Sequence, residues 1–290
     1  MQELFTQYNR LLFKLAYQLT GSVTDAEDVV QDVFLKVYDV PADKLTEPKA
    51  YLCKMVANRC RDLQKTARKK REQYYGEWLP EPFSSSDNDT MDAVVRDDLL
   101  SYGMLVLLER LTPSERIVFV LREALGFEYG EIARLTEKSE VNCRKVFSRA
   151  TAKMGLDADD EPFIPSQTAN REWVQGFIGA LKQGNMDQIL ALLDQDVVSI
   201  ADGGGKATAV LKPLVSKKKV AHFLLGALRK GALVDGEARF DLEMINGQPS
   251  FAVRSAEGLI HTVGLLQVED NRIRHLFIIR NPDKLKHVGA

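Results

Sequence analysis

The stretch Pro48–Glu72 most constrains how this chain can fold, because two patterns run through it at the same spacing. Its apolar residues recur every three or four positions, so a helix would gather them in one buried stripe. They are Leu52, Met55, Val56, Cys60 and Leu63. A second set follows the same rhythm on another face: Lys54, Asn58, Arg61, Lys65 and Arg68. The sequence therefore predicts an amphipathic helix with a polar, mostly basic face.

The charge of this helix indicates a partner. Eight basic residues and one acid, Asp62, lie between Lys54 and Arg71, whereas the whole chain has a net charge of −2. A phosphate backbone is the expected counter-surface of so local a positive charge. A solvated helix face is the alternative, since most charged runs have no specific partner. A second basic element further along the chain favours nucleic acid.

Length and composition set the outer bounds. A chain of 290 residues suggests two or three domains, and 45% hydrophobic residues suffice for buried cores. Its three cysteines, Cys53, Cys60 and Cys143, form no C-x-x-C pair and fall on apolar helix faces, so reduced thiols in a cytoplasmic protein are expected. The N-terminus lacks a signal-peptide pattern, and no apolar run approaches the ~18 residues of a membrane span. We expect neither secretion nor membrane insertion, and no metal or cofactor.

Two further helices are predicted before this stretch. The first has apolar residues at helical spacing from Leu4 to Leu19 and ends at Gly21, where a left-handed backbone costs little. The second begins at Thr24, whose hydroxyl would form a capping box with Glu27. One face of the second helix is predicted to point outward: Asp28, Gln31, Asp32 and Leu35. It is typical of a docking surface, although a single exposed leucine also occurs without function.

The composition changes abruptly after Arg71. Residues 76–83 read GEWLPEPF, and the prolines disfavour a helix before about Met91. Seven acids and one arginine between Glu77 and Asp98 indicate an acidic linker. Its Ser/Asp part is typical of a spacer. The segment Trp78-Leu79-Pro80 instead predicts a specific contact, because a linker without contacts seldom contains tryptophan.

A helix-turn-helix pattern follows the linker. A helix start at Thr112–Glu115 precedes a short helix over 128–135, a turn over 136–138 and a second helix capped by Ser139. The second helix has a basic outward face: Arg144, Lys145, Ser148 and Arg149. Such a face suits a DNA major groove, whereas a structural pair of helices is the usual alternative.

These segments resemble one family, the extracytoplasmic-function (ECF) sigma factors of bacterial RNA polymerase. DAEDVVQDVFLKVY (25–38) is similar to their region 2 helix that docks on polymerase, and PKAYLCKMVANRCRD (48–62) to their minus-10 reading helix. LTPSERIVFVLREALGFEYGEIARLTEKSEVNCRKVFSRATAKM (111–154) is similar to region 4, which reads the minus-35 element. The resemblance covers about residues 1–155.

The resemblance implies roles for the residues above. It implies docking of Asp28, Gln31, Asp32 and Leu35 on the clamp helices of the β′ subunit, and of region 4 on the β flap. It implies promoter contacts, including the single-stranded minus-10 region, by Lys54, Asn58, Arg59, Arg61, Asp62, Lys65, Arg68, Arg144, Lys145, Ser148 and Arg149. The loop before Pro48 becomes a candidate pocket for a flipped base.

The last 135 residues follow a different pattern, with helices first and strands later. Helices are predicted at Trp173–Leu181, Ile189–Leu193 and Val220–Leu228. Strands are predicted at Val197–Ala201, Ala207–Leu211, Ala238–Ile245, Ser250–Arg254, Leu259–Val268 and Arg272–Ile279. This order indicates α+β with a curved antiparallel sheet. It resembles the cone-shaped α+β barrel of SnoaL-like proteins, which extends a recognised group of sigma factors.

The resulting architecture is multidomain. We expect region 2 at 1–75, a linker at 76–92, an all-α region 4 at 93–156, a connector at 157–168 and a SnoaL-like barrel at 169–290. Asp202, His222, His261 and His275 are the polar groups of the barrel suited to acid/base chemistry, but a structural role is favoured for each. No catalytic residues are therefore predicted.

The barrel is instead predicted to regulate the sigma regions in cis, because tethering gives it a high effective concentration. Three segments look like motifs of that group of sigma factors, and their residues are expected to contact one another: Trp78, Leu79, Pro80, Asp202, Gly203, Gly204, Gly205, Lys206, Asn281, Pro282, Asp283, Lys284 and Leu285. A monomer without a separate anti-sigma factor follows. Two alternatives are a one-component helix-turn-helix regulator with a ligand-binding barrel and a cyclase or isomerase fused to a DNA-binding module.

Overall fold

The computed structural model describes residues 2–38, 40–41, 45–84, 100–156, 170–229 and 239–288, with the side chains of 65–72 and 229 left out. The chain divides into two compact units. The helical unit contains Met1–Glu72, Ala93–Leu100 and Met104–Ile164. The sheet unit contains Gln73–Asp92, Ser101–Gly103 and Pro165–Ala290. Both halves of the chain contribute to the sheet unit, since two short segments from before region 4 belong to it.

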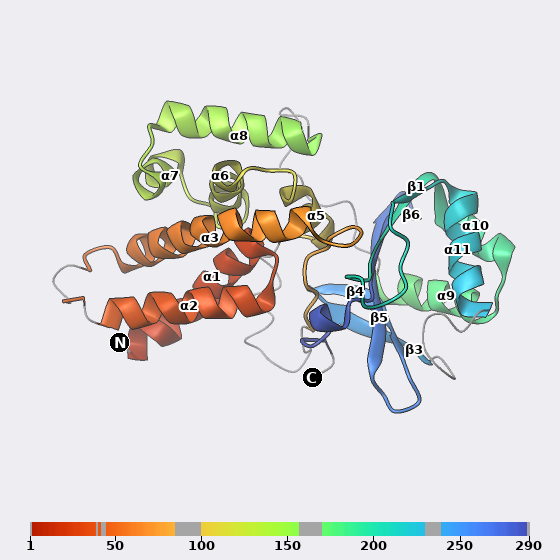
Figure 1. The fold of residues 1–290 in the computed structure, drawn as a ribbon. Helices are drawn as coiled ribbons and strands as arrows, with labels where there is room; N and C mark the ends of the chain where they lie inside the picture. Colours follow the sequence, from red (N-terminus) through yellow and green to blue (C-terminus); the bar gives the residue numbers. More distant parts are fainter. Residues whose placement is uncertain are drawn as a thin grey trace. The chain divides into compact units, whose positions relative to one another are not determined.

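Helices build the helical unit (Figure 1). They are α1 (Gln2–Thr20), α2 (Val23–Tyr38), α3 (Pro48–Glu72), α6 (Pro113–Glu123), α7 (Tyr129–Thr136) and α8 (Glu140–Met154), together with α5 (Tyr102–Leu108) from Met104 onward. Helix α1 packs against α2, α3 and α6, and α8 packs against α6 and α7. The two predicted sigma regions thus share one packed unit.

Most predicted helix ends are confirmed. Gly21 has a φ of +69°, Pro48 is the first residue of α3, and Thr112 forms a capping box with Glu115. Ser139 caps α8 by accepting a hydrogen bond from Asn142 N at 3.3 Å.

The predicted start of the second helix is wrong. Helix α2 begins at Val23, and the Ser22 hydroxyl accepts a hydrogen bond from Asp25 N at 3.1 Å. Thr24 therefore lies inside the helix. Ser22 is an equally good N-cap residue one step earlier, so composition alone does not separate the two.

A buried arginine joins helices α1 and α6. Arg116 on α6 is 3% exposed, and its Nε donates to the carbonyl oxygen of Gln18 on α1 at 3.0 Å. Its Nη1 pairs with Glu109 Oε1 at 2.6 Å. A buried guanidinium needs such partners, because leaving its charge unpaired would cost on the order of several kcal/mol of folding stability. The pairing thus fixes α6 on α1.

The cysteine prediction is confirmed. Cys53, Cys60 and Cys143 are free and buried. Burial raises the pKa of the Cys53 and Cys60 thiols to about 12. In the residues that the structure describes, no helix is long and apolar enough to cross a membrane.

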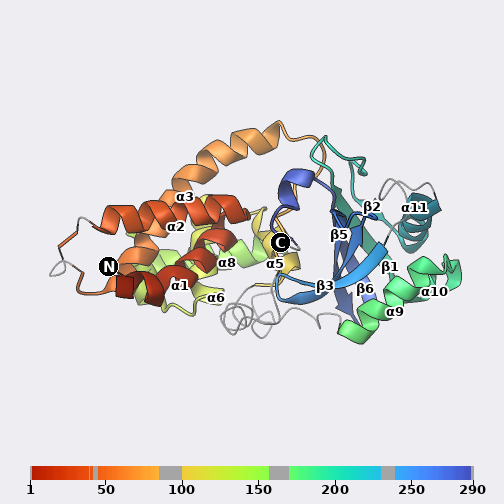
Figure 2. The ribbon, with the colours of Figure 1, turned by 90° about the horizontal axis from the view of Figure 1, so that it is seen from below.

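The sheet unit is built on six strands in the order β2-β1-β6-β5-β4-β3. They are β1 (Leu193–Asp202), β2 (Leu214–Val215), β3 (Arg239–Ile245), β4 (Gln248–Arg254), β5 (Ile260–Glu269) and β6 (Arg272–Ile279). Helices α9 (Arg171–Lys182), α10 (Met186–Leu192) and α11 (Lys217–Arg229) lie on one face of the sheet (Figures 1 and 2). This is the α+β arrangement that was expected, with helices covering one face of a sheet.

Two strand predictions are wrong. Residues 207–211 form no strand; the second strand is the short β2, and Ala207–Leu211 belong to an irregular loop with an exposed Leu211. The sheet is also mixed rather than antiparallel, because β1 and β6 pair in parallel, with Ile200 opposite Phe277. The alternation of apolar and polar residues along a strand indicates which face of the sheet is buried. It does not indicate which strands pair or in which direction.

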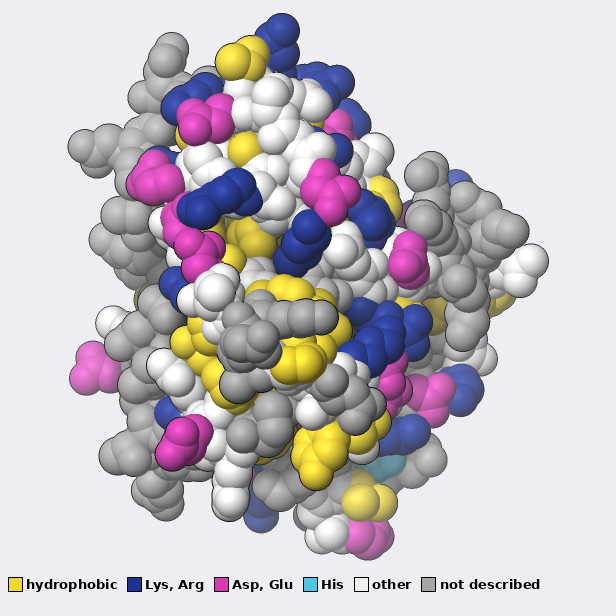
Figure 3. Space-filling model, turned by 90° about the vertical axis from the view of Figure 1, so that its left-hand side faces the viewer, with side chains coloured by type: hydrophobic (Ala, Val, Ile, Leu, Met, Phe, Trp, Pro, Cys, Tyr) yellow, Lys and Arg dark blue, Asp and Glu magenta, His cyan; other side chains and the backbone are white. Residues whose placement is uncertain are grey.

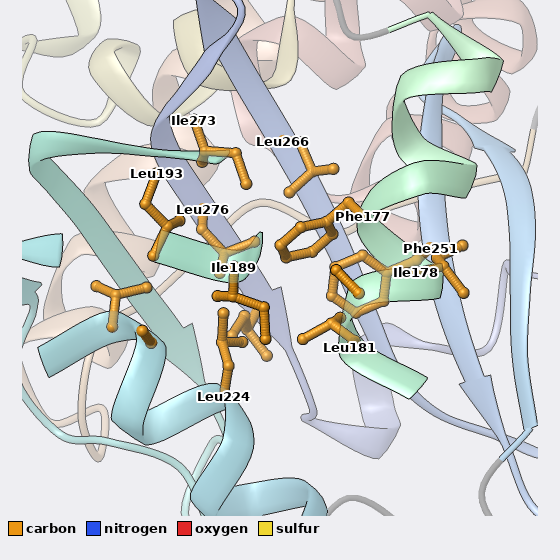
Figure 4. Close-up of a cluster of buried hydrophobic side chains, with 14 of the residues drawn as sticks. Phe177, Ile178, Leu181, Ile189, Leu193, Leu224, Phe251, Leu266, Ile273 and Leu276 are labelled. Atoms are coloured by element: carbon orange, nitrogen blue, oxygen red, sulfur yellow. The ribbon is translucent and has the colours of Figure 1, made fainter. Parts of the chain in front are cut away.

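The core of the sheet unit lies between the sheet and the three helices (Figure 4). Phe177 from α9 packs beside Phe251 from β4, with ring centroids 5.9 Å apart. Ile189 and Leu224 come from the other two helices, and Leu276 from β6. The side chains that fill this region are therefore apolar.

Candidate functional site

The outward face of α8 is as predicted. Arg144, Lys145, Ser148 and Arg149 are exposed, while Cys143 is buried on the opposite face. Arg144 lies 4.4 Å from the centre of the Tyr129 ring and pairs with Glu140 at 3.6 Å. Three of these four side chains thus remain available for a phosphate backbone or base edges.

Helix α3 also presents the predicted faces. Leu52, Val56 and Cys60 are buried, whereas Arg61 and Asp62 are exposed. Lys54, Asn58 and Arg59 are partly exposed. Lys65 and Arg68 lie in the helix, but their side chains are outside the described residues.

The beginning of α3 contacts the helix-turn-helix within the helical unit. Lys54 Nζ lies 2.7 Å from Glu137 Oε1, at the residue that ends α7 with a φ of +56°. Arg134 of α7 lies 3.5 Å from Glu47, in the loop before α3. A pocket of about 200 Å³ between them is lined by Thr46, Glu47, Ala50, Tyr51, Lys54, Glu131, Arg134 and Leu135. Lys54 is thus occupied by an internal partner.

The predicted polymerase-docking face is only partly free. Asp28, Gln31 and Leu35 are exposed, Leu35 by 64%. Asp32 instead forms an ion pair with Arg59 of α3, with Arg59 Nη2 3.0 Å from Asp32 Oδ2. Asp32, predicted to bind polymerase, and Arg59, predicted to bind promoter DNA, therefore bind each other.

An apolar groove adjoins this face. It has a volume of about 680 Å³ and lies between α1 and α2. Its lining includes Gln31 and Leu35 together with Phe5, Phe34 and Tyr38. Figure 3, a view onto the side where α1 begins and α2 ends, shows hydrophobic side chains gathered there beside Lys and Arg.

The sheet unit holds the beginning of the linker through a cluster that we call the linker site: Tyr74, Leu79, Asp202, Asn281 and Lys284. Asp202 is fully buried at the end of β1. Its Oδ1 accepts a hydrogen bond from the Tyr74 hydroxyl at 2.6 Å, and its Oδ2 accepts one from Leu79 N at 2.9 Å. Lys284 Nζ lies 2.7 Å from the same Oδ2.

Lys284 completes the hold on the linker. It is 5% exposed and donates a second hydrogen bond, to the carbonyl oxygen of Leu79. Its ammonium lies 4.1 Å from the centre of the Trp78 ring and 5.0 Å from that of Tyr74. The Asp202–Lys284 ion pair therefore binds both the N–H and the carbonyl oxygen of Leu79. The rings of Trp78 and Tyr74 cover the ammonium of Lys284.

Glycines make room for this cluster. Gly204 has a φ of +58°, and a Cβ there would lie 2.3 Å from Asn281 Nδ2. Asn281 caps the 3-10 helix Pro282–Lys284 and donates to the Tyr74 hydroxyl at 2.8 Å. Lys206 pairs with Asp283 nearby. Backbone approach this close requires residues without a side chain.

The other residues that were predicted to contact the linker lie around the linker site. Gly203 lies where a Cβ would be 2.2 Å from the Ala207 carbonyl oxygen. Pro80 is buried, and Leu285, also buried, ends the 3-10 helix that begins at Pro282. The sequence-predicted segments 78–80, 202–206 and 281–285 thus lie together.

Two tyrosines were missed. Tyr74 belongs to the linker site, where burial and its hydrogen bond to Asp202 raise the pKa of the phenol above its ordinary value. Tyr102 is fully buried, and its hydroxyl donates to the Pro80 carbonyl oxygen at 2.6 Å. Both flank the linker, and aromatic residues in a polar connecting segment were the available signal.

The candidate acid/base groups lie in unrelated settings. Asp202 is taken up by the linker site. His222 is exposed on α11, with Nδ1 2.7 Å from the Lys218 carbonyl oxygen, and His275 stacks on Phe277 of β6. Across the described ranges, no group of three His, Cys, Asp or Glu side chains could hold a metal ion.

Comparisons with known proteins agree with this geometry. Residues 4–71 match the family Sigma-70 region 2, and residues 104–154 match Sigma-70, region 4. The ECF RNA polymerase sigma factor SigJ of Mycobacterium tuberculosis is 32% identical over 97% of this chain and 91% of its own length. The probable ECF sigma factor SigI of the same species is 28% identical over 96% of this chain and 92% of its own. The crystal structure of SigJ superposes with a TM-score of 0.79 at 29% identity, covering 100% of this chain and 99% of that one.

Proposed function

Because the chain belongs to the ECF family of RNA polymerase sigma factors, we propose that its sheet unit regulates promoter-directed initiation in cis, by binding the linker between regions 2 and 4. The basic activity of this chain follows from its membership of the family. The chain is an initiation factor and not an enzyme: with core RNA polymerase it directs transcription from promoters. The site of this activity is the cytoplasm, where the polymerase is.

One observation carries the regulatory proposal. The buried pair Asp202–Lys284 holds the backbone N–H and carbonyl of Leu79, which lies eight residues after the end of the region 2 match. Removing one partner of a buried ion pair is strongly destabilising, because the other charge stays buried without compensation. The backbone N–H and carbonyl oxygen that these two side chains bind both belong to Leu79, in the linker. The cluster is therefore suited to hold or release the linker as one body.

The exposed surfaces of the helical unit suit the partners of a sigma factor. We assign polymerase docking to Asp28, Gln31 and Leu35, with Asp32 joining after its pair with Arg59 opens. Promoter contacts are assigned to two sets of residues. They are Lys54, Asn58, Arg59, Arg61, Asp62, Lys65 and Arg68 on α3, and Arg144, Lys145, Ser148 and Arg149 on α8.

The helical unit would have to change before it reads DNA with both helices. Lys54 is bound to Glu137 and Arg134 to Glu47, so region 4 covers the beginning of α3. Both pairs are exposed to solvent and therefore weak. A promoter or polymerase that binds the two regions apart would have to break these pairs and also the buried hydrogen bond from Arg116 of α6 to the Gln18 carbonyl oxygen of α1. The tethered sheet unit would make a separate anti-sigma factor unnecessary, and the free protein would be a monomer.

The test is transcription in vitro with bacterial core polymerase, using the full chain, Trp78→Ala and Lys284→Met on the same promoters. Lys284→Met keeps the length of the side chain and removes the ammonium that binds Leu79. We expect both variants to change initiation at least threefold in the same direction, since each loosens the linker. Lys182→Met, an exposed lysine of the same unit, is the matched control and should transcribe like the parent.

Two outcomes would contradict the proposal. Equal transcription by the parent, Trp78→Ala and Lys284→Met, with release of the linker verified by proteolysis, would exclude regulation through the linker site. DNA binding without polymerase, together with no initiation in its presence, would instead support the one-component regulator.

A further inference from the structure

The turn of the helix-turn-helix places a carboxylate beside α3, the helix to which we assign promoter contacts. Glu137 lies in this turn, and its Oε1 is 2.7 Å from Lys54 Nζ on α3. The hydrogen bond from Lys54, the charge of Lys54 and the charge of Arg61 together hold the pKa of Glu137 below its ordinary value. Lys54 and Arg61 both belong to the proposed promoter contacts. The carboxylate of Glu137 therefore lies among cations that suit a DNA phosphate.

The backbone of Glu137 adopts a conformation that is unfavourable for a glutamate. The residue ends α7 with a φ of +56° and a ψ of +43°, in the left-handed region, and its N–H donates to the carbonyl oxygen of Ala133. Glycine and asparagine adopt this conformation at the lowest cost. The turn alone would therefore favour one of those two residues. We infer that the glutamate is present for what its side chain binds.

Other contacts join region 4 to the beginning of α3 around this carboxylate. The ammonium of Lys49 on α3 lies 4.8 Å from the centre of the Phe127 ring, and Phe127 is buried in the segment between α6 and α7. Arg134 on α7 lies 3.5 Å from Glu47, in the loop before α3. Glu137 is therefore part of a wider contact and not an isolated surface pair.

A buried hydrogen bond holds region 4 against region 2. Arg116 of α6 is 3% exposed, and its Nε donates to the Gln18 carbonyl oxygen of α1 at 3.0 Å. The pair between Lys54 and Glu137 is exposed to solvent, so by itself it would compete poorly with a DNA strand. Because region 4 is held in place, Glu137 is presented to Lys54 by the same molecule, at a high effective concentration. A weak pair can then compete with a phosphate that must bind from solution.

We propose that Glu137 occupies a phosphate site of α3, formed by Lys54 and Arg61, and thereby weakens the binding of single-stranded DNA to the free protein. A carboxylate and a phosphate both accept charge-assisted hydrogen bonds, so they compete for the same ammonium. Separation of region 4 from region 2 uncovers the site. The inference rests on the proposed function, because that function assigns Lys54 and Arg61 to promoter contacts.

The experiment is the binding of a fluorescein-labelled oligothymidine strand to the full chain without polymerase, measured by fluorescence anisotropy at about 50 mM salt. Phosphate contacts do not depend on base sequence, so the promoter need not be known. Glu137→Gln should bind the strand about two- to fivefold more tightly than the parent, which is the range that an exposed ion pair allows. Glu172→Gln, which removes an exposed acid of α9, is the matched control and should bind like the parent.

A double-mutant cycle connects this gain to Lys54. In the Lys54→Met background, Glu137→Gln should tighten binding less than about 1.5-fold, because the ammonium that the carboxylate occupies is gone. An equal gain in both backgrounds would overturn the inference, since general charge repulsion would then explain it. No gain from Glu137→Gln in the parent, including no detectable binding by either protein, would overturn it as well.

A second variant separates the carboxylate from the backbone of the turn. Glu137→Gly removes the side chain and also relaxes the left-handed conformation. It should give the same gain as Glu137→Gln, whereas a gain found only in Glu137→Gly would assign the effect to the turn and contradict the inference.

The proposed function and this inference fail in different ways. If Glu137→Gln leaves DNA binding unchanged while Lys284→Met still alters initiation by core polymerase, regulation through the linker site stands and the phosphate site alone fails. If Lys54→Met does not weaken binding in the Glu137→Gln background, the assignment of Lys54 to promoter contacts fails together with the inference.

Discussion

Replacing Asp202 by asparagine is a direct measure of how tightly the linker is bound. The carboxylate accepts hydrogen bonds from Tyr74, Leu79 N and Lys284 at 2.6, 2.9 and 2.7 Å. An amide of the same shape offers one oxygen and turns two N–H donors toward groups that are themselves donors. Lys284, only 5% exposed, would then lack its anion.

The magnitude follows from burial. Removing one partner of a buried ion pair costs about 3–5 kcal/mol, because the other charge stays buried and unpaired. Lys284 keeps the Leu79 carbonyl and two aromatic rings, so we take the lower end, about 3 kcal/mol. That corresponds to a shift of roughly 150-fold from bound toward released linker.

Trp78 reports this shift. The chain has two tryptophans, so Trp173→Phe leaves Trp78 as the single emitter. Trp173 stacks on Phe177, and phenylalanine preserves an aromatic ring there. In this background, acrylamide quenching of Asp202→Asn should approach that of a free peptide spanning 76–84. Denaturant unfolding of the sheet unit should lose about 3 kcal/mol.

Two comparisons make the result decisive. Asp283→Asn removes a carboxylate whose partner, Lys206, is more than half exposed, and should cost less than about 1 kcal/mol. Adding Lys284→Met to Asp202→Asn should recover part of the loss, since the unpaired charge is removed. Unchanged quenching and unfolding in Asp202→Asn would refute the view that this pair holds the linker.

Three further predictions concern single residues. Gly204→Ala should destabilise the sheet unit by about 1–3 kcal/mol in thermal melting, because its φ is +58° and its Cβ would meet Asn281; a change below about 0.5 kcal/mol would contradict the geometry. Burial raises the pKa of Glu115, but hydrogen bonds from Lys153 and the helix cap outweigh it and hold the pKa below its ordinary value. The ionised carboxylate thus stabilises the helical unit above about pH 4.3 and that stability is lost as the pH falls further, so Glu115→Gln should flatten the acid limb of a stability–pH curve, and an unaltered limb would argue against it. Leu35→Arg should weaken binding to core polymerase about tenfold or more in a fluorescence titration while the melting temperature is unchanged, since Leu35 is 64% exposed; undiminished binding would remove Leu35 from the docking surface.

The sequence predicted the helical part of the fold well because its signals are local. Apolar spacing, Pro48, and the caps at Thr112 and Ser139 each act within a few residues. The start of α2 shows the limit, since Ser22 and Thr24 are both good caps. In the sheet unit, the parallel pairing of β1 with β6 depends on contacts between residues about eighty positions apart, which periodicity does not record.

The candidate site divides in the same way. Segments 78–80, 202–206 and 281–285 were grouped from the family resemblance, and the structure brings them together. Which atoms meet was not predictable, because the pairing of Asp202 with Lys284 requires the fold of the whole sheet unit. Tyr102 was missed for the same reason: its partner Pro80 is 22 residues away, beyond a helical turn or a hairpin.

The buried cysteines limit the kinds of signal that this sigma factor reads directly. A thiol with a pKa of about 12 is ionised in roughly one molecule in 100,000 at pH 7, and the thiolate is the form that oxidants attack. Cys53 and Cys60 lie on α3, the helix to which we assign promoter contacts. Peroxide or a disulfide-forming agent would therefore leave this helix chemically unchanged. Oxidising conditions that modify exposed thiols should therefore spare Cys53 and Cys60.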